Sequence, residues 1–320
     1  MRKIKWGIIG LGNIANKFAQ TITTMESVEL AAVAARNKNK SEDFGKTYGV
    51  PAEKCYGSYD EIVKDSNVDV IYISVPHTFH KELSILCLSN GKAVLCEKPV
   101  TISEDEIREV IEVAKREKLF FMEAMKTRFL PINQLVKQYI NEGKIGDVRL
   151  LQADFGFNLP FDPNNRLYNK DLGGGALLDV GIYNISYNTF IFGNNPTSIN
   201  SNMYIGQSGV DESVSIDLAY ENGKHAQLFG AINLTTRREA NIIGTKGRIC
   251  VPRFSNADTA YIVIGDNEEK INIPFEINGF EYQIKEVVKC LNEGKLQSDI
   301  MSWDDSIEAM RILDTVKNSI

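Results

Sequence analysis

A glycine-rich turn between an apolar run and an expected helix constrains this chain most. The run Ile4–Ile9 leads directly into Gly10-Leu11-Gly12-Asn13-Ile14-Ala15, which has the form G-x-G-x-x-A. At such a turn the first glycine allows a sharp bend, the second lets the backbone approach a pyrophosphate, and the small third residue lets helix and strand pack closely. The N–H groups at the helix start then bind phosphate. The residues predicted to bind a dinucleotide here, rather than to form a purely structural turn, are Gly10, Gly12, Asn13 and Ile14.

The first 122 residues repeat an alternation of short β-branched runs and helical stretches. This alternation is typical of a parallel sheet covered by helices on both faces. We therefore predict a Rossmann dinucleotide-binding domain of the α/β class over residues 1–122. The expected strands are Ile4–Ile9, Val28–Ala34, Val68–Ser74, Ala93–Cys96 and Leu119–Met122.

The pattern changes after residue 122, and a chain of 320 residues is long enough for a second domain. Longer strand-like stretches follow at Val148–Phe157, Val214–Tyr220 and His225–Leu234. Asn222-Gly223 between the last two is a strong signal for a hairpin with a two-residue loop. These stretches predict an α+β domain over residues 123–320, with a large, mostly antiparallel open sheet. The helices expected there are Pro131–Glu142, Phe280–Asn292 and Trp303–Val316.

Composition excludes several classes of partner. The net charge is −6, with 36 basic and 42 acidic residues interspersed, which argues against nucleic acid as a partner. No long apolar run or signal peptide is recognisable, so no membrane span is expected. The five cysteines are odd in number and widely spaced, which argues against a disulfide framework or a thiolate metal site. We therefore expect a cytoplasmic protein without a metal.

The end of the second expected strand bears on the cofactor. NAD-specific domains usually place Asp or Glu there to bind the ribose 2′-hydroxyl. Here no acid occurs before Glu42, and basic and polar residues cluster instead. An arginine at this position can pair with a 2′-phosphate, so we predict NADP(H) as the preferred cofactor and NAD(H) as a second one. The alternative is a solvated basic loop. The predicted 2′-phosphate ligands are Arg36, Asn37 and Lys40.

A lysine lies at the end of another expected strand. Cys96-Glu97-Lys98-Pro99 closes the run Ala93–Cys96, and ligands of open α/β sheets bind beyond the carboxyl ends of the strands. Pro99 restricts Lys98 to an extended conformation and supplies no N–H. A surface turn is the alternative, but the position favours a role for Lys98 in the site.

A second glycine run precedes an otherwise apolar helix. Gly173-Gly174-Gly175 leads into a helix expected to continue to Phe192, with Gly193 as its stop. Asp179 and Tyr183 are four residues apart and therefore face the same way. A tyrosine phenol has a pKa near 10, and the Lys98 ammonium nearby would lower the pKa of Tyr183 by favouring the phenolate. The alternative is a buried tyrosine bonded to aspartate.

Together these segments resemble a known family. The chain is similar to the glucose–fructose oxidoreductase / inositol dehydrogenase (Gfo/Idh/MocA) family, and within it to the branch that oxidises trans-dihydrodiols and D-xylose. The matching segments cover nearly the full length in order. They are Gly10–Ala15, Glu97–Pro99, Glu123-Ala124 with Thr127–Pro131, Gly173–Tyr183, Gly244–Gly247 and Phe280–Tyr282.

The resemblance implies residue roles. Lys98 would contact substrate and ribose and tune the acid/base, Asp179 would orient the substrate or Lys98, and Tyr183 would be the general acid/base. Many sugar-acting members carry histidine at this last position, but the diol-oxidising branch carries tyrosine. The resemblance further implies a homodimer or homotetramer assembled through the C-terminal sheet. Its other implied cofactor contacts are Pro76, His77 and Glu97.

One departure from the branch concerns the substrate. Lys126 stands where tryptophan is usual, which places aromatic diols in doubt and favours a more polar or anionic substrate, unless Lys126 points to solvent. Core packing is an equally good account of each phenylalanine among the remaining candidates. The remaining candidate substrate contacts are Arg128, Phe155, Phe157 and Phe280.

The predicted function is an NADP(H)-dependent oxidoreductase that acts on a small sugar, polyol or trans-diol. Hydride would pass between nicotinamide and the substrate carbon while Tyr183 exchanges the hydroxyl proton. One alternative is a redox-neutral glycoside hydrolase with tightly bound NAD. Another is a non-enzymatic NAD(P)-binding sensor, because fold alone does not settle function.

Overall fold

The computed structural model describes residues 2–319, which divide into two compact units. The first unit comprises the residues up to 101, residues 105–124 and residues 276–303. The second comprises residues 102–104, residues 125–275 and those from 304 onward. Residues 276–303 thus belong to the first unit although they follow most of the second in sequence. The predicted division after residue 122 stays a prediction.

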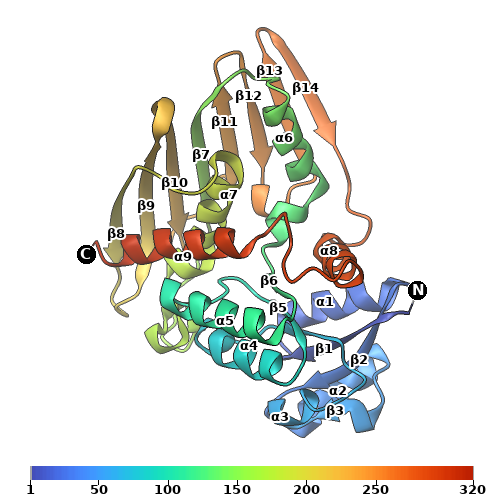
Figure 1. The fold of residues 1–320 in the computed structure, drawn as a ribbon. Coiled ribbons are helices and arrows are strands. Elements are labelled where there is room, and N and C mark those ends of the chain that lie inside the picture. Colours follow the sequence, from blue (N-terminus) through green and yellow to red (C-terminus); the bar gives the residue numbers. More distant parts are fainter. Residues whose placement is uncertain (1, 320) are drawn as a thin grey trace. The chain divides into compact units, whose positions relative to one another are not determined.

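The first unit is built on a six-stranded parallel sheet in the order β3-β2-β1-β4-β5-β6 (Figure 1). Its central strands are apolar and buried on both faces, as the continuous apolar runs predicted. This confirms the Rossmann-like sheet. The strands are β1 (Ile4–Ile9), β2 (Val28–Ala34), β3 (Cys55–Tyr56), β4 (Val70–Ile73), β5 (Ala93–Cys96) and β6 (Phe121–Glu123).

Amphipathic helices cover this sheet. In α5 the buried residues Ile107, Val110, Ile111 and Ala114 recur at helical spacing and form one apolar face. Trp303 anchors the segment 276–303, because its indole Nε1 donates to the carbonyl oxygen of Phe121 at 3.0 Å. The helices of this unit are α1 (Asn13–Thr24), α2 (Lys38–Tyr48), α3 (Tyr59–Ile62), α4 (His80–Ser89), α5 (Glu104–Glu117, whose first residue belongs to the second unit) and α8 (Glu281–Asn292).

The second unit contains an eight-stranded sheet in the order β14-β13-β12-β11-β7-β10-β9-β8 (Figure 1). The interior neighbours β7 and β10 run parallel, and the other neighbouring pairs of this sheet are antiparallel. The predicted large, mostly antiparallel sheet is therefore confirmed. Its strands are β7 (Val148–Gly156), β8 (Ser198–Ile205), β9 (Asp211–Tyr220), β10 (Lys224–Ala231), β11 (Glu239–Gly244), β12 (Gly247–Pro252), β13 (Thr259–Ile264) and β14 (Asn267–Asn272).

The predicted hairpin joins β9 to β10, with a loop one residue longer than expected. Tyr220 pairs with Lys224, so Glu221, Asn222 and Gly223 form the loop. Asn222 has φ 60° and Gly223 has φ 69°, which are the left-handed conformations that made this dipeptide a turn signal. The extra residue, Glu221, is the part that the dipeptide did not predict.

The two faces of the large sheet differ. Along β9 the buried residues Val214, Ile216 and Leu218 alternate with Ser215 and Asp217. Helix α7 (Ile182–Phe192) packs against β7 and β10, and α6 (Pro131–Asn141) packs against β13 (Figure 1). The opposite face carries polar side chains around a shallow depression. These include Gln152, Asp154, Asp217, Gln227 and Asn241.

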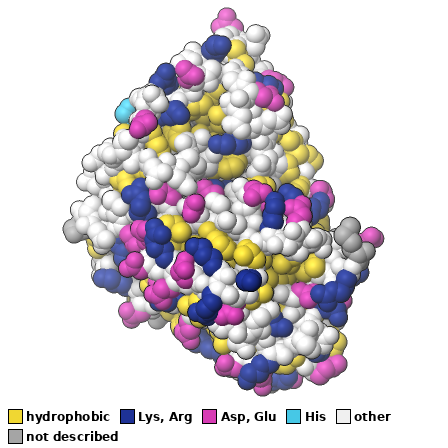
Figure 2. Space-filling view, in the orientation of Figure 1, with side chains coloured by type: hydrophobic (Ala, Val, Ile, Leu, Met, Phe, Trp, Pro, Cys, Tyr) yellow, Lys and Arg dark blue, Asp and Glu magenta, His cyan; other side chains and the backbone are white. Residues whose placement is uncertain are grey.

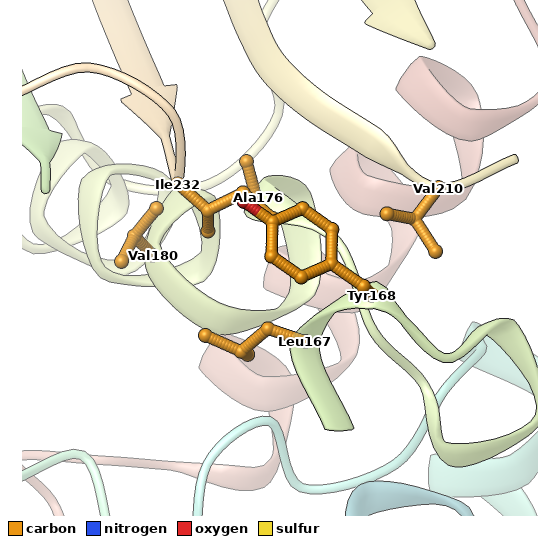
Figure 3. Packing of buried hydrophobic residues seen from close by; sticks show 6 residues of the cluster. All are labelled: Leu167, Tyr168, Ala176, Val180, Val210 and Ile232. Atoms are coloured by element: carbon orange, nitrogen blue, oxygen red, sulfur yellow. The ribbon is translucent and has the colours of Figure 1, made fainter. Parts of the chain in front are cut away.

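A small apolar cluster fixes the irregular segment between β7 and α7. Tyr168 is central to it, and its phenol donates to the carbonyl oxygen of Leu159 at 2.7 Å. Figure 3 shows the cluster residues around the helix start that follows this segment. The cluster comprises Leu167, Tyr168, Ala176, Val180, Val210 and Ile232.

Among residues 2–319, no helix is long and apolar enough to cross a membrane. On the face drawn in Figure 2, acidic and basic side chains lie interspersed, as the sequence indicated.

Candidate functional site

The two glycines of the first turn have different structural roles. Gly10 has φ +87°, and a Cβ there would lie 2.7 Å from the carbonyl oxygen of Ser74. A Cβ on Gly12 would meet no atom within 4 Å. Gly12 is the N-cap of α1 and offers no side-chain cap, and the first turn of the helix carries no acid. The helix therefore begins beside open space with its N–H groups exposed, an arrangement that fits a pyrophosphate.

Beyond β2, some polar side chains are hydrogen-bonded within the protein and others are available for a ligand. Asn37 caps α2, because its Oδ1 accepts from the N–H of Asn39 at 2.9 Å and that of Lys40 at 3.4 Å. The Lys38 ammonium donates to the carbonyl oxygen of Cys55. Within the described residues, the side chains of Arg36 and Lys40 have no ion-pair partner, and both are exposed. They remain available for a 2′-phosphate.

A buried histidine connects the loops that follow β4 and β5. The Nδ1 of His80 lies 2.7 Å from the carbonyl oxygen of Pro99, and its Nε2 lies 2.9 Å from that of Val75. The ring of His77, itself buried, packs edge-on against His80 at 5.8 Å. His80 thus ties the Val75–His77 loop to the Lys98–Pro99 loop, a link between distant residues that the sequence pattern did not predict.

The carboxylate of Glu97 is bound within the first unit. It accepts from the phenol of Tyr72 and, at 3.2 Å, from the backbone N–H of Lys98, which precedes a cis proline peptide. The Tyr72 ring stacks on Phe18 of α1 at 3.7 Å. Phe280, a candidate substrate contact, is buried and packs edge-on against Phe18 at 6.1 Å. Its role in substrate binding stays a prediction.

The helix that carries Asp179 and Tyr183 begins irregularly. Residues Leu177–Gly181 form a π-helical turn, and α7 continues from Ile182 to Phe192. Gly193 ends the helix with φ 84°, at the predicted position. The π turn was not predicted, because it has no local sequence signature. Such turns insert a residue into the helix and recur at functional sites.

The glycine run before this helix fits a closed turn. A Cβ on Gly174 would lie 2.6 to 2.8 Å from three carbonyl oxygens, and one on Gly175 would lie 2.1 Å from Oδ1 of Asp211. The Asp211 carboxylate accepts from the N–H of Leu177 at 2.5 Å. Burial raises the pKa of Asp211 to about 6. Asp211 therefore caps the helix start from β9, a long-range contact that sequence reasoning missed.

Asp179 forms an ion pair that the sequence did not predict. The Arg166 guanidinium lies 2.8 Å from Oδ1 of Asp179, whose side chain is 10% exposed. Tyr183 is half-buried, and its ring lies 5.4 Å from that of Phe155. Asp179 and Tyr183 share the helix start as predicted, but the carboxylate bonds to Arg166. No short sequence motif connects Arg166 to this helix.

The other basic candidates have partners in the second unit. The Lys126 ammonium donates to Oδ1 of Asn256. Arg128 is 2% exposed and pairs with Asp305 at 3.0 Å. Arg128 also donates to the hydroxyls of Ser186 at 3.1 Å and Thr189 at 2.6 Å. These contacts show that Arg128 is a buried residue whose charge is paired within the core. Substrate-binding roles for Lys126 and Arg128 stay predictions.

The parallel sheet, its glycine turn and the second large sheet define a two-unit protein of the dinucleotide-binding class. The sequence model of the protein family described as "Oxidoreductase family, NAD-binding Rossmann fold" (GFO_IDH_MocA) matches residues 4–125. A second family model, "GFO/IDH/MocA C-terminal domain", matches residues 133–250. The chain belongs to the Gfo/Idh/MocA oxidoreductase family, which confirms the resemblance described above.

Curated relatives lie in the expected branch. The chain is 37% identical over 321 residues to trans-1,2-dihydrobenzene-1,2-diol dehydrogenase of Xenopus laevis, covering 97% of this chain and 96% of that protein. It is 34% identical over 327 residues to the Homo sapiens protein of the same name, covering 99% and 97%.

Solved structures share the fold. An aldose–aldose oxidoreductase from Caulobacter crescentus, complexed with glycerol, is 24% identical with a TM-score of 0.92, covering 99% of this chain and 97% of that one. A 3-ketoreductase from Actinomadura kijaniata, in complex with NADP and TDP-benzene, is 24% identical with a TM-score of 0.88, covering 99% and 98%.

Proposed function

We propose that this oxidoreductase uses NADP(H) to interconvert a secondary alcohol and its carbonyl in a small sugar, polyol or trans-diol. The observation that carries the proposal is the half-buried Tyr183 at the π-helical start of α7, one turn beyond a paired Asp179. A partly exposed phenol held by a rigid helix can exchange a proton with a substrate hydroxyl. The dehydrogenase names of the curated relatives further support the proposal.

The cofactor is proposed from the fit of the first unit. The backbone at Gly10, Gly12, Asn13 and Ile14 would hold the pyrophosphate, because the Gly12 side of the turn is open and α1 is uncapped. When bound, the cofactor supplies or accepts the hydride. The complex of the 3-ketoreductase with NADP supports the same choice. Arg36 and Lys40 would hold the 2′-phosphate together with the side-chain amide N–H of Asn37, whose Oδ1 caps α2. Pro76, His77, Glu97 and Lys98 would line the nicotinamide side.

The chain's own residues would then manage the proton. In the oxidation direction the Tyr183 phenolate removes the substrate hydroxyl proton, and in reduction the phenol returns it. The positive charge of Lys98 is proposed to favour the phenolate and to bind the substrate oxygen. Asp179 would orient the substrate hydroxyl, while Arg166 offsets its negative charge at 2.8 Å.

Assembly and compartment belong to the same proposal. One face of the large sheet bears polar side chains around its shallow depression, and we propose that two copies associate through it as a dimer or within a tetramer. The described cysteines are all free thiols, which suits a reducing cytoplasm.

The first experiment measures NADPH and NADH binding by fluorescence titration, followed by a turnover screen of diols, pentoses, hexoses and inositols. We expect tighter binding of NADPH and turnover of one substrate class. Arg36→Ala should lower the preference for NADPH over NADH by roughly 10-fold or more, because it removes a charged donor to the 2′-phosphate. An unchanged cofactor preference in this variant would contradict the proposed role of Arg36.

Tyr183→Phe tests the acid/base role. We expect kcat to fall by roughly 100-fold or more while the Kd for NADPH stays the same. The matched control is Tyr187→Phe, since Tyr187 lies one turn further along α7, is fully buried and bonds to Asn133 at 3.3 Å. An unaffected rate in Tyr183→Phe refutes the mechanism. Tight cofactor binding without any turnover favours a sensor, and glycoside cleavage without net cofactor change favours the redox-neutral hydrolase.

A further inference from the structure

Arg238, just before β11, is held in a defined position beside two aromatic rings. Its backbone N–H donates to Oδ2 of Asp154 at 2.8 Å, and its Nε donates to the carbonyl oxygen of Gly156 at 3.0 Å. The guanidinium lies over the ring of Phe155 at 5.4 Å and over that of Phe157 at 6.0 Å. Backbone and side chain are thus fixed separately, and the planar guanidinium faces aromatic surfaces that favour a cation.

This position lies close to the proposed acid/base. The Phe155 ring lies 5.4 Å from the ring of Tyr183 and 5.4 Å from Cζ of Arg238. Cζ of Arg238 therefore lies within about 11 Å of the Tyr183 ring. The Phe155 ring contacts both groups, so a substrate that packs along this ring would lie near both.

Arg238 differs from the other cations of the second unit near these residues. Arg166 pairs with Asp179, and Arg128 pairs with Asp305. Within residues 2–319, the terminal nitrogens of Arg238 have no hydrogen-bond or ion-pair partner. The half-buried guanidinium therefore keeps donors available beside Phe155 and Phe157.

We propose that Arg238 binds a carboxylate on the substrate, so that the substrate class is a sugar acid or polyhydroxy acid. The inference rests on the proposed function, because it assumes that the hydroxyl oxidised at Tyr183 belongs to the same molecule. A guanidinium presents parallel N–H donors that match the two oxygens of a carboxylate. The C–H face of the sugar chain would pack on Phe155 and Phe157.

The charges around Arg238 favour a carboxylate over a phosphate. A phosphate dianion calls for more than one cation, but the Arg166 and Arg128 guanidinium groups already pair with carboxylates. The Asp154 carboxylate, which accepts the backbone N–H of Arg238, lines the depression on the opposite face of the sheet. One available arginine on an aromatic wall therefore fits a single negative charge.

The test is a comparison of matched substrates with NADP⁺ as oxidant. D-Gluconate is compared with sorbitol, D-glucuronate with glucose, and glucose 6-phosphate serves as the phosphate arm. We expect kcat/KM for the acids to exceed that for their neutral partners by roughly 10-fold or more. Arg238→Ala should lower kcat/KM for the acids by roughly 10- to 100-fold, mainly through KM, because the contact exists before and during the reaction.

The neighbouring arginine provides the matched control. Arg237 has a side chain 84% exposed and lies 3.5 Å from Glu239, so Arg237→Ala removes the same charge from the adjacent position. This control should retain the preference for acids. Arg238→Lys should recover part of it, because the charge remains but the planar fork is lost.

The outcomes separate this inference from the proposed function. Equal turnover of neutral and acidic partners, or an equal loss on both in Arg238→Ala, overturns the carboxylate site and leaves the dehydrogenase intact. A preference for glucose 6-phosphate overturns the choice of anion. If no compound is turned over, the proposed function fails. The carboxylate site is then tested by the shift in melting temperature that each compound causes in the NADPH-saturated protein. Stabilisation by D-gluconate but not sorbitol, lost in Arg238→Ala, supports the site, and its absence overturns it.

Discussion

The molecule contains two glycine-rich turns that lead into helices, and they differ in how each helix begins. At Gly10–Gly12 the helix start is uncapped and a Cβ on Gly12 would meet open space. At Gly173–Gly175 the turn is filled by carbonyl oxygens, and the carboxylate of Asp211 accepts the N–H of Leu177. An open start exposes backbone N–H groups to an anionic ligand, whereas a closed start fixes the side chains that follow it.

The comparison shows that glycine content alone does not define a phosphate site. A glycine-rich turn can accept a phosphate only where the space left by the missing side chain is empty and is not already occupied by the protein. Gly12 has extended backbone angles, φ −98° and ψ −167°, that any residue can adopt. Its backbone conformation therefore does not require glycine, and the proposed reason for glycine here is the room that it leaves for a ligand. Gly175 has φ +108° and lies against Asp211, so the fold itself requires it.

The largest expected effect is on stability at the closed turn. Gly175→Ala should lower the free energy of unfolding by about 2–4 kcal/mol, because it combines an unfavourable positive φ with a clash against Asp211. Gly49→Ala is the control, since Gly49 has φ +75° but no atom near its absent Cβ. Its cost should be about 1 kcal/mol. Thermal unfolding followed by circular dichroism measures both, and similar losses would show that the Asp211 contact does not matter.

Asp211 gives the closed turn a pH dependence. Burial raises its pKa to about 6, above its ordinary value of 3.8, so the folded protein binds a proton between these values that the unfolded chain does not. Its contribution to stability therefore rises as the pH falls through this window, and above pH 6 the ionised form costs up to about 3 kcal/mol.

Asp211→Asn tests this dependence, because the amide can still accept from Leu177 but does not titrate. Relative to the parent protein, the variant should gain stability on going from about pH 4.5 to pH 7.5. Denaturant unfolding at the two pH values measures the gain. Asp217→Asn, on the exposed side of the same strand, is the control. Parallel pH curves for the parent protein and Asp211→Asn would exclude a raised pKa at this carboxyl.

A substitution in the open turn should weaken cofactor binding and leave the stability of the fold nearly unchanged. Gly12→Ala places a methyl group in the space proposed for the pyrophosphate, while its backbone angles suit alanine. We expect the Kd for NADPH to rise by roughly 10- to 100-fold, which is about 1.4–2.8 kcal/mol, with little change in melting temperature. Fluorescence titration and thermal unfolding check the two parts. A large loss of stability without loss of binding would reverse the comparison.

The smallest effect is expected at α2, whose start is capped by a side chain. Asn37→Ala removes the acceptor for the N–H groups of Asn39 and Lys40. It should lower the free energy of unfolding by about 1 kcal/mol. Asn37→Asp, which keeps the cap, is the stability control, and by its charge it should also weaken NADPH binding. If alanine and aspartate destabilise equally, the cap contributes nothing measurable.

Much of the fold could be predicted from the sequence, because its signals are local. Five apolar runs marked strands of the parallel sheet, and only the two-residue β3 at Cys55–Tyr56 was missed, since it is too short to show a pattern. The Asn222-Gly223 turn identified a hairpin of the second sheet through its left-handed residues. The C-terminal end of α7 at Phe192 followed from the glycine stop at Gly193.

The candidate site was less predictable, because its contacts are distant in sequence. Asp211 reaches Leu177 across 34 positions, and Arg166 reaches Asp179 across 13 positions of irregular chain. Arg238 carries no motif, and its position over Phe155 and Phe157 distinguishes it from the exposed Arg237. The sequence indicated which residue types the site contains. It did not indicate the ion pairs in which these residues take part, such as that of Asp179 with Arg166.

The outermost strand of the large sheet, β14, bears on how copies of this chain can meet. It pairs with β13 alone, and its sequence Asn267–Asn272 includes Glu268, Glu269 and Lys270, all exposed. Charged side chains along a sheet edge discourage another strand from adding to its free backbone groups. At this margin the charged strand therefore protects the protein against open-ended, fibre-like stacking of one sheet onto another.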